Sequence, residues 1–259
     1  MLIVLSPAKS LDFTPPPETL PATRPELIEE TARLAVTARR LKASDLRRLM
    51  GISDKLATLN RERFQAFDPE SEVGVQAALA FAGDVYQGLD ARSLDAGALG
   101  WAQERVRILS GLYGVLRPLD RIQPYRLEMG VRLKTRRGDS LYDFWGERIA
   151  KALRAATDGH DDPSVVNLAS QEYFGAVDVR ALKRPVIEVR FLEEKDGQAR
   201  VISFFAKKAR GMMARWAIER RADRAEALKG FDAGGYRFQP AASTDGVWTF
   251  SRPQPPSPS

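Results

Sequence analysis

One polar stretch with several glycines and prolines, LSGLYGVLRPLDRIQPYRLEMG at 109–130, has the residue types needed to bind phosphate and transfer protons. Arg117 and Arg126 could each hold a phosphate group, and Glu128 could act as a general acid or base. The same charges also suit an internal arrangement in which Arg117 pairs with Asp120 and Arg126 with Glu128. The sequence leaves both interpretations open.

A second candidate site follows the apolar run PSVVNL. Asn167, Ser170 and Glu172 come at or just after residues that predict a buried strand. Strand ends in α/β sheets commonly hold ligands, and these side chains offer hydrogen-bonding and acid–base groups. The alternative is that Ser170 simply caps a helix.

The stretch LRRLMGISDKLATLN at 46–60 could bind a phosphate through its backbone. Gly51 supplies a positive φ that ends a first helix, Ser53 can cap a second helix, and Lys55 follows on its outer side. This pattern resembles the helix-hairpin-helix motif of DNA repair and replication proteins, in which N–H groups of a helix N-terminus contact a phosphate. Two residues depart from the motif: Ser53 replaces its second glycine, and the carboxylate of Asp54 repels phosphate. Two packed helices without a DNA contact are the alternative.

Basic residues are concentrated in three windows, 33–63, 117–137 and 200–224, in a chain with a formal net charge of +6. If these windows converge in space, they form a face for a polyanion; if they do not, they are solvated helix faces. The candidate phosphate contacts outside the hairpin are Lys9, Arg117, Arg126, Lys207, Lys208 and Arg210.

Metal and thiol chemistry find little support in the composition. The chain has no cysteine, and its one histidine, His160, lies in the turn-forming run TDGHDDP, where a solvated loop position is expected. We therefore predict no metal centre and no cofactor. The lack of cysteine fits a reducing cytoplasm, and no run of about 18 apolar residues predicts a membrane span.

The pattern of apolar residues predicts the elements that position these groups. Leu2–Leu5 is expected to be a buried strand, and Leu56 and Leu59 are expected to form the apolar face of the second hairpin helix, with Ser44 or Asp45 capping the first. The other expected elements are helices from about Pro25 to Leu41, from Asp68-Pro69 toward Ala80, from Ser140 to Ala156 and from Lys207 to Ala222, and a β-hairpin with a type I′ turn at Asp196-Gly197.

Together these elements predict a mixed α/β (α+β) fold. We expect a single compact domain at 1–252 with a central sheet, flanking helices and a helix-hairpin-helix element at about 44–60. The Pro- and Ser-rich residues 253–259 are expected to be a disordered tail.

Several segments in the same order along nearly the whole chain carry a resemblance to one family: SPAKSLDF, ISDKLA, FAGDVYQGL, LSGLYGVLRPLD, QPYRLEMG, FWG, NLASQEYF and ISFFAKKARG. The chain resembles the YaaA family of bacterial peroxide stress proteins. The resemblance implies a cytoplasmic protein that helps limit free iron and oxidative DNA damage under hydrogen peroxide. It also implies a helix-hairpin-helix and a basic cleft that bind duplex or distorted DNA, and it supplies no catalytic residues and no protein partner.

Two further hypotheses belong to other functional classes. One is an enzyme that acts on a phosphorylated or nucleotide substrate at the loops of Arg117, Arg126 and Glu128 and of Asn167, Ser170 and Glu172. The other is direct sequestration of iron by surface carboxylates, for which the acidic segments outside the basic windows are the only support.

Overall fold

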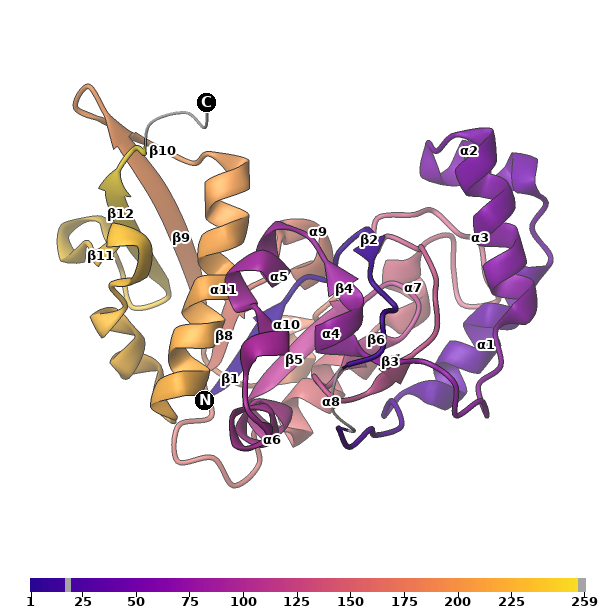
Figure 1. Cartoon of the computed structure of the whole chain (residues 1–259), viewed down its shortest axis with the longest axis horizontal. Helices are drawn as coiled ribbons and strands as arrows, with labels where there is room; N and C mark the ends of the chain where they lie inside the picture. Colours follow the sequence, from indigo (N-terminus) through magenta and orange to yellow (C-terminus); the bar gives the residue numbers. More distant parts are fainter. Residues whose placement is uncertain (17–19, 256–259) are drawn as a thin grey trace.

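A computed structural model describes residues 1–16 and 20–255 of the chain. These residues form one α/β domain built around a mixed sheet, with a group of three helices at one end of the molecule (Figure 1). The predicted fold class is therefore confirmed.

The central sheet contains a core of five parallel strands. Its order is β11-β12-β9-β8-β1-β5-β6, and β10 pairs with the far end of β9. The parallel strands are β1 (Leu2–Leu5), β5 (Val106–Ser110), β8 (Val165–Leu168), β9 (Val186–Lys195) and β12 (Val247–Pro253), and the antiparallel ones are β6 (Gly114–Leu116), β10 (Gln198–Arg200) and β11 (Arg237–Phe238).

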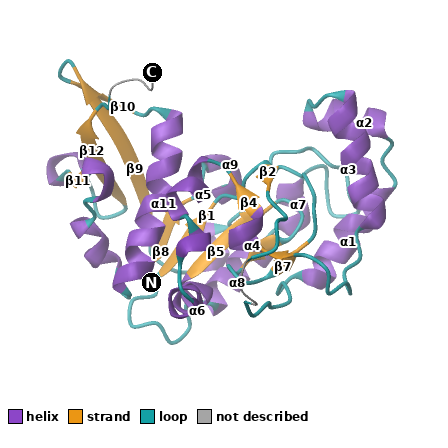
Figure 2. Cartoon of the chain, in the orientation of Figure 1, coloured by secondary structure: helices purple, strands orange, loops and turns teal. Residues whose placement is uncertain are grey.

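Helices cover the sheet, and its central strand β1 is apolar throughout. All four residues of β1 are buried, as expected for a strand with packed layers on both faces. The helices around the sheet, coloured purple in Figure 2, are α5 (Asp84–Leu89), α6 (Ala96–Arg105), α7 (Leu141–Trp145), α8 (Arg148–Ala155), α9 (Gln171–Phe174), α10 (Val179–Leu182) and α11 (Ser203–Arg220). None of the described helices is both long and apolar enough to cross a membrane.

The closest helix contact joins α5 to α11, the longest helix. A Cβ atom added to Gly211 would lie 1.8 Å from the carbonyl oxygen of Val85, and one added to Gly88 would lie 2.1 Å from that of Lys208. Glycine at both positions lets the two backbones touch. This contact fixes the middle of α11 against α5.

Three helices form an arm at the right-hand end of Figure 1: α1 (Ile28–Arg39), α2 (Ala43–Met50) and α3 (Asp54–Ala66). Gly51 has φ of 61° and ends α2, and Ser53 is the N-cap of α3, as predicted. Arg39 joins α1 to the end of α3, because its guanidinium donates to the carbonyl oxygens of Phe64 and Phe67.

Two expectations for this arm are wrong. The N-cap of α2 is Lys42, whose N–H donates to the Asp45 carboxylate at 3.1 Å, so Ser44 and Asp45 lie inside the helix. The predicted apolar face of α3 is also wrong: Leu56 and Leu59 are 39% and 38% exposed, whereas Ala57, Asn60 and Phe64 are buried. A short amphipathic pattern did not identify the buried face, since a polar residue lies on it.

Short segments connect the arm to the sheet. β2 (Ser10–Leu11) pairs with β4 (Phe81–Ala82), and β3 (Val75–Gln76) pairs with β7 (Arg121–Ile122). The helix expected after Asp68-Pro69 is wrong, because only α4 (Ala77–Ala80) is helical there. Within the described residues, 3₁₀ helix is found at Ala91–Ser93, Ala225–Gly230, Ala233–Gly235 and Pro240–Ala242.

Of three further expectations, one is confirmed and two are wrong in part. The turn at Asp196 and Gly197 is confirmed, with φ of 52° and 75°. The single helix expected from Ser140 is wrong in part, because Gly146 has φ of 48° and separates α7 from α8. The start of the expected tail at 253 is wrong, since Pro253 belongs to β12; residues 256–259 lie outside the described part of the chain.

The contact between α5 and α11 predicts a large effect of one methyl group. Gly211→Ala should destabilise the protein by about 2 kcal/mol or more, because the new Cβ clashes with a backbone oxygen that cannot move without shifting α5. Urea unfolding at constant m-value measures this. Gly100→Ala in α6 is the matched control: a Cβ there meets nothing within 4 Å, so it should stabilise by up to about 1 kcal/mol. Equal stability of the two variants would contradict the proposed close packing.

Candidate functional site

The carboxyl ends of β1 and β8 lie side by side at the point where the order of strands along the chain reverses. The two strands are parallel neighbours, with Leu5 opposite Leu168. The chain leaves β1 for β5 on one side, whereas it leaves β8 for β9 on the other side. In open α/β sheets such a switch point is the usual place for a ligand.

Serines from the two loops connect at this switch point. Ser6 follows β1, and its Oγ accepts a hydrogen bond of 2.8 Å from the N–H of Ser170, which follows β8. The two serine hydroxyls lie 3.4 Å apart. The phenol of Tyr86, from α5, donates to the carbonyl oxygen of Ser6 at 3.0 Å. Three segments distant in sequence are thereby held at one place.

Lys9, Arg126 and Glu128 form the charged part of the site. Arg126 Nε lies 3.0 Å from Glu128 Oε1, and Lys9 Nζ lies 3.7 Å from the same oxygen. The predicted pairing of Arg126 with Glu128 is confirmed. The other carboxylate oxygen, Oε2, is buried and has no hydrogen-bond partner among the described residues. Glu128 therefore retains a free acceptor beside two cations.

Glu172 and Asn60 connect this charged group to its neighbours. Glu172 Oε1 accepts from the N–H of Gly130 at 3.0 Å. The Asn60 side chain accepts from the N–H of Arg126 at 2.9 Å and donates to its carbonyl oxygen at 2.6 Å. Asn60 is the buried polar residue of α3, so the arm is attached to the loop that carries Arg126 and Glu128.

Buried phenols form the floor of the site. Burial raises the pKa of Tyr86, Tyr125 and Tyr173 above the ordinary value for tyrosine, and the negative charges of Glu172 and Glu128 raise the pKa of Tyr173 further. Tyr125 bonds to the hydroxyl of Ser110 at 2.6 Å. These phenols stay neutral at physiological pH and can donate hydrogen bonds rather than act as bases.

The arrangement suits anion binding and proton transfer. Lys9 is exposed and Arg126 is partly buried, so both can meet an anion, and Glu128 or Glu172 can accept a proton. Across residues 1–16 and 20–255, no three histidine, aspartate or glutamate side chains lie where they could hold a metal ion. Burial lowers the pKa of His160 to about 4, so it is neutral near pH 7 and less solvated than expected.

The turn between α2 and α3 presents the predicted backbone geometry. Ser53 Oγ accepts from the N–H of Leu56 at 3.3 Å, and Gly51, Ser53 and Lys55 are exposed. Asp54 is 3.1 Å from Arg47 of α2, and this ion pair reduces the repulsion that Asp54 alone would exert on a phosphate.

Arg117 lies apart from the switch point. Its Nε and Nη2 lie 3.1 and 2.9 Å from Asp120 Oδ1, and Asp120 is fully buried. Arg117 also donates to the carbonyl oxygen of Arg24, and Asp120 accepts from the hydroxyl of Thr23. The predicted pairing of Arg117 with Asp120 is confirmed. Arg117 follows Leu116, which pairs with Ile108 in the middle of β5, whereas Gly114 at the other end of β6 pairs with Ser110 at the carboxyl end of β5.

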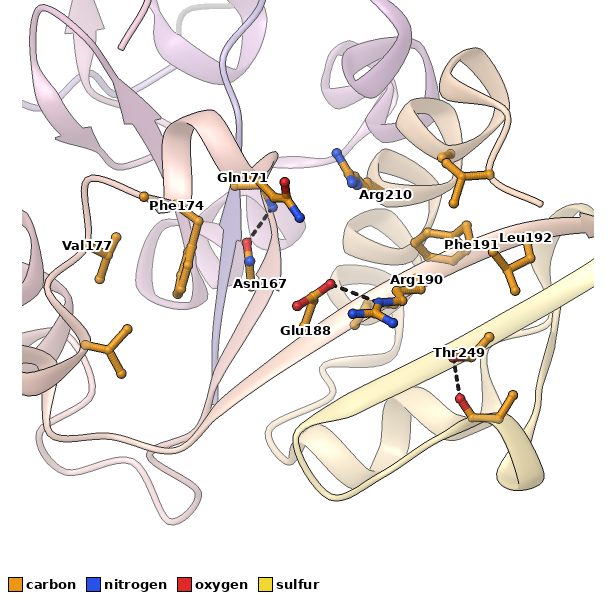
Figure 3. A pocket seen from close by; sticks show the side chains of 17 residues that line it. Asn167, Gln171, Phe174, Val177, Glu188, Arg190, Phe191, Leu192, Arg210 and Thr249 are labelled. Atoms are coloured by element: carbon orange, nitrogen blue, oxygen red, sulfur yellow. Dashed lines mark hydrogen bonds and ion pairs between the residues drawn. The ribbon is translucent and has the colours of Figure 1, made fainter. Parts of the chain in front are cut away.

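The basic residues of α11 divide between two surroundings. Lys207 and Lys208 are exposed near the start of the helix. Arg210 is partly buried and lines a cavity between α11 and the end of β8 (Figure 3). The first and second basic windows meet in a groove lined by Arg33, Arg40, Lys134, Arg136 and Arg137, and no residue of the third window is in that lining.

A basic groove that the sequence interpretation missed lies between α1 and the segment after Gly130. It has a volume of about 570 Å³, and its lining includes Arg33, Val36, Thr37, Arg40, Lys134, Thr135, Arg136, Arg137 and Phe144, without a carboxylate among the described residues. Two patterns could have indicated it. Val131 and Leu133 are buried while Lys134 and Arg136 are exposed, as in an extended segment on an apolar surface. Arg33 of α1 and Arg40, the C-cap of that helix, are seven residues apart.

Comparisons with known proteins agree across the chain. Residues 1–242 match the model of a family described as peroxide stress protein YaaA. A UPF0246 protein of Phenylobacterium zucineum is 69% identical over 258 residues, covering 100% of this chain and 97% of that protein. UPF0246 proteins of Caulobacter vibrioides and Roseobacter denitrificans are 66% and 55% identical, and the matches cover 98% and 99% of this chain and 100% of each relative.

The ion pair of Arg117 predicts a structural role. Asp120→Asn should destabilise the protein by about 3 kcal/mol, because it removes a buried charge that accepts from Arg117 and Thr23. Asp54→Asn, which breaks the exposed pair with Arg47, should cost less than about 1 kcal/mol. Thermal and urea unfolding compare the two variants. A cost for Asp120→Asn as small as that of the control would show that the buried pair is not structural.

Proposed function

Because this chain belongs to the YaaA family of peroxide stress proteins, we propose that it protects DNA by binding duplex or distorted DNA through a basic surface. The proposal places the protein in the cytoplasm of a bacterium exposed to hydrogen peroxide. It includes a contribution to limiting free iron and oxidative DNA damage, which the family's stress role supports.

The basic groove between α1 and the segment 134–137 is the observation that carries this proposal. Five basic side chains line it, from helix and loop. Phosphate is bound by arginine and lysine, and neutralised phosphates release counterions, which favours binding at low salt. A groove with this lining suits the backbone of a nucleic acid better than a neutral ligand.

The arm supplies further contacts beyond the groove. Arg40 of the groove lies at the end of α1, and α2 then leads to the turn of Gly51, Ser53 and Lys55. The backbone N–H groups in the first turn of α3 would receive one phosphate, and Lys55 would add a positive charge. Exposed Leu56 and Leu59 offer apolar contact beside this turn.

Lys9 and Arg126 extend the proposed surface toward the sheet. Asn60 fixes α3 to the Arg126 backbone, and Arg126 and Lys9 share Glu128. Two further proposed contacts, Lys207 and Lys208, are exposed on α11, the helix that packs against α5. We leave Arg117 and Arg210 out of the proposed contacts, because one pairs internally with Asp120 and the other lines a cavity.

Salt dependence tests the proposed binding. If roughly five phosphates are neutralised, log K should fall with log salt with a slope of about −4 to −5 for duplex DNA. Lys134→Gln combined with Arg136→Gln should reduce the magnitude of that slope by about 2. Fluorescence anisotropy with duplex, bulged and single-stranded DNA measures both values.

A control variant distinguishes binding at this surface from non-specific attraction of DNA to positive charge elsewhere on the protein. Lys195→Gln, at the exposed tip of the β9–β10 hairpin, should leave the slope unchanged. Affinity that does not depend on salt, or full binding after Lys55→Glu together with Lys134→Glu, would rule out the proposed surface.

A second candidate function is an enzyme that acts on a phosphorylated or nucleotide substrate at the switch point. The observation that favours it is the buried Glu128 Oε2, which lacks a partner among the described residues and belongs to a carboxylate shared by Lys9 and Arg126. Lys9 and Arg126 would hold phosphate, while Glu128 or Glu172 would transfer protons.

Turnover assays test the second candidate. Incubation with nucleotides and with oxidised DNA should yield a product, and Glu128→Gln should lower its rate by about 10²–10⁴-fold if Glu128 transfers a proton. Glu172→Gln tests the other carboxylate. Product formation that is unchanged in both variants, or no product at all from these substrates, would exclude this use of the site.

A further inference from the structure

A gap opens in the sheet on the β8 side of β9. β8 pairs with β9 only at Val186–Glu188, and β10 pairs with it from Glu193 onward. Within the described part of the chain, β9 therefore has no strand beside residues 189–192 on this side, although β12 pairs with it along the other side.

The backbone N–H and C=O groups of Phe191 face this gap. The N–H of Glu188 donates to Gly246 on the β12 side, and the carbonyl oxygen of Glu194 accepts from Gln254 on the same side. Backbone groups alternate in direction along a strand, so the N–H and C=O of Phe191 point to the opposite, open side. They provide one donor and one acceptor for a ligand.

A cavity of about 830 Å³ fills the gap. Figure 3 shows its walls: Asn167, Gln171 and Phe174 lie on the β8 and α9 side, and Arg210 comes from α11 on the other side. This is the carboxyl end of β8, where α/β sheets place ligands, and the volume falls in the range of small-molecule sites.

Arg210 is the charged group of this cavity. Its Nε is buried and has no hydrogen-bond partner among the described residues. Burial lowers the pKa of its guanidinium, and the charge of Glu188 raises it. A guanidinium remains protonated in proteins, so a buried N–H of Arg210 is unsatisfied and suits an anion.

Glu188 does not cancel this preference. Its carboxylate is 3.0 Å from Arg190 Nε, so it already has a cationic partner. The net charge of these three side chains favours an anion. The amides of Asn167 and Gln171 add polar groups, and Phe174 provides an aromatic surface for a flat ring.

We propose that this cavity binds a small phosphate ester with a flat ring, of the size of a nucleoside monophosphate. Arg210 and the Phe191 N–H hold the phosphate, and the ring packs on Phe174. Asn167 and Gln171 bond to the polar edge of the ligand. The site is separate from the DNA-binding surface proposed above and does not depend on it.

Isothermal titration calorimetry on the full chain tests the proposal. The probes are adenosine, guanosine, cytidine and uridine 5′-monophosphates, phenyl phosphate, adenosine and inorganic phosphate. At least one ring-bearing phosphate should bind with a Kd below about 1 mM, which is the weak limit for a specific small ligand. It should bind at least tenfold tighter than adenosine or inorganic phosphate. Comparable binding of adenosine would contradict the role of the phosphate.

Three variants locate the binding. Arg210→Gln should weaken the tightest probe at least tenfold, and circular dichroism shows whether the variant folds. Gln171→Glu places a negative charge at an exposed position of the same cavity and should weaken binding even if Arg210→Gln fails to fold. Lys195→Gln, which removes an exposed cation at the tip of the β9–β10 hairpin and outside the cavity lining, should change the Kd less than twofold.

Two outcomes overturn the proposal. One is that none of the ring-bearing phosphates binds with a Kd below 1 mM. The other is that such binding persists undiminished in Arg210→Gln or, where that variant does not fold, in Gln171→Glu.

Discussion

The burial of β1 is the constraint on which the rest of the structure depends. β1 lies between β5 and β8 and is buried along its whole length, and the ammonium group of Met1 before it donates to the carbonyl oxygen of Asp223 at 2.6 Å. A strand paired along both edges cannot shift its register without losing those bonds and exposing apolar side chains. Its carboxyl end is therefore fixed, and with it the position of Ser6 and Lys9.

Glu128 links the segment after β1 to the arm. One of its oxygens is shared by Lys9, which follows β1, and Arg126, whose backbone is bonded on both sides to Asn60 of α3. The arm thus reaches the sheet through a polar connection rather than through apolar packing alone. Each charge has an opposite charge beside it, so the connection is stable where an isolated Glu128 would be costly.

Much of the fold could be predicted from local patterns, because local patterns determine local structure. The strand at Leu2–Leu5, the turn at Asp196-Gly197 and the Ser53 cap follow from residue type and spacing. The pairs of Arg117 with Asp120 and of Arg126 with Glu128 were foreseeable because the partners lie three and two residues apart.

The parts of the candidate sites that could not be predicted depend on segments distant in sequence. The basic groove joins α1 to a loop about a hundred residues later, and the cavity of Arg210 exists because β8 ends while β9 continues. Asn60 was assigned no role, since only the loop of Arg126 makes its burial favourable. Residue spacing within one element contains no signal for such contacts.

The groove also shows why a count of basic residues overstates the charge available to a polyanion. Glu30 lies within 4 Å of three arginines, at 2.8 Å from Arg33, 2.5 Å from Arg137 and 3.7 Å from Arg148, and its hydrogen bond with Arg137 lowers the pKa of its carboxyl group. Arg33 and Arg137 are therefore partly neutralised before any phosphate arrives.

Arg40, Lys134 and Arg136 differ from these two arginines. Lys134 is 87% exposed, and its contact with Asp139, which is 74% exposed, is long at 3.9 Å and contributes little in water. Arg40 and Arg136 are exposed on the rim of the same groove. Counterions gather around charges that lack a fixed partner, so these three side chains would account for most of the counterion release, whereas Glu30 holds Arg33 and Arg137 in place and shapes the groove.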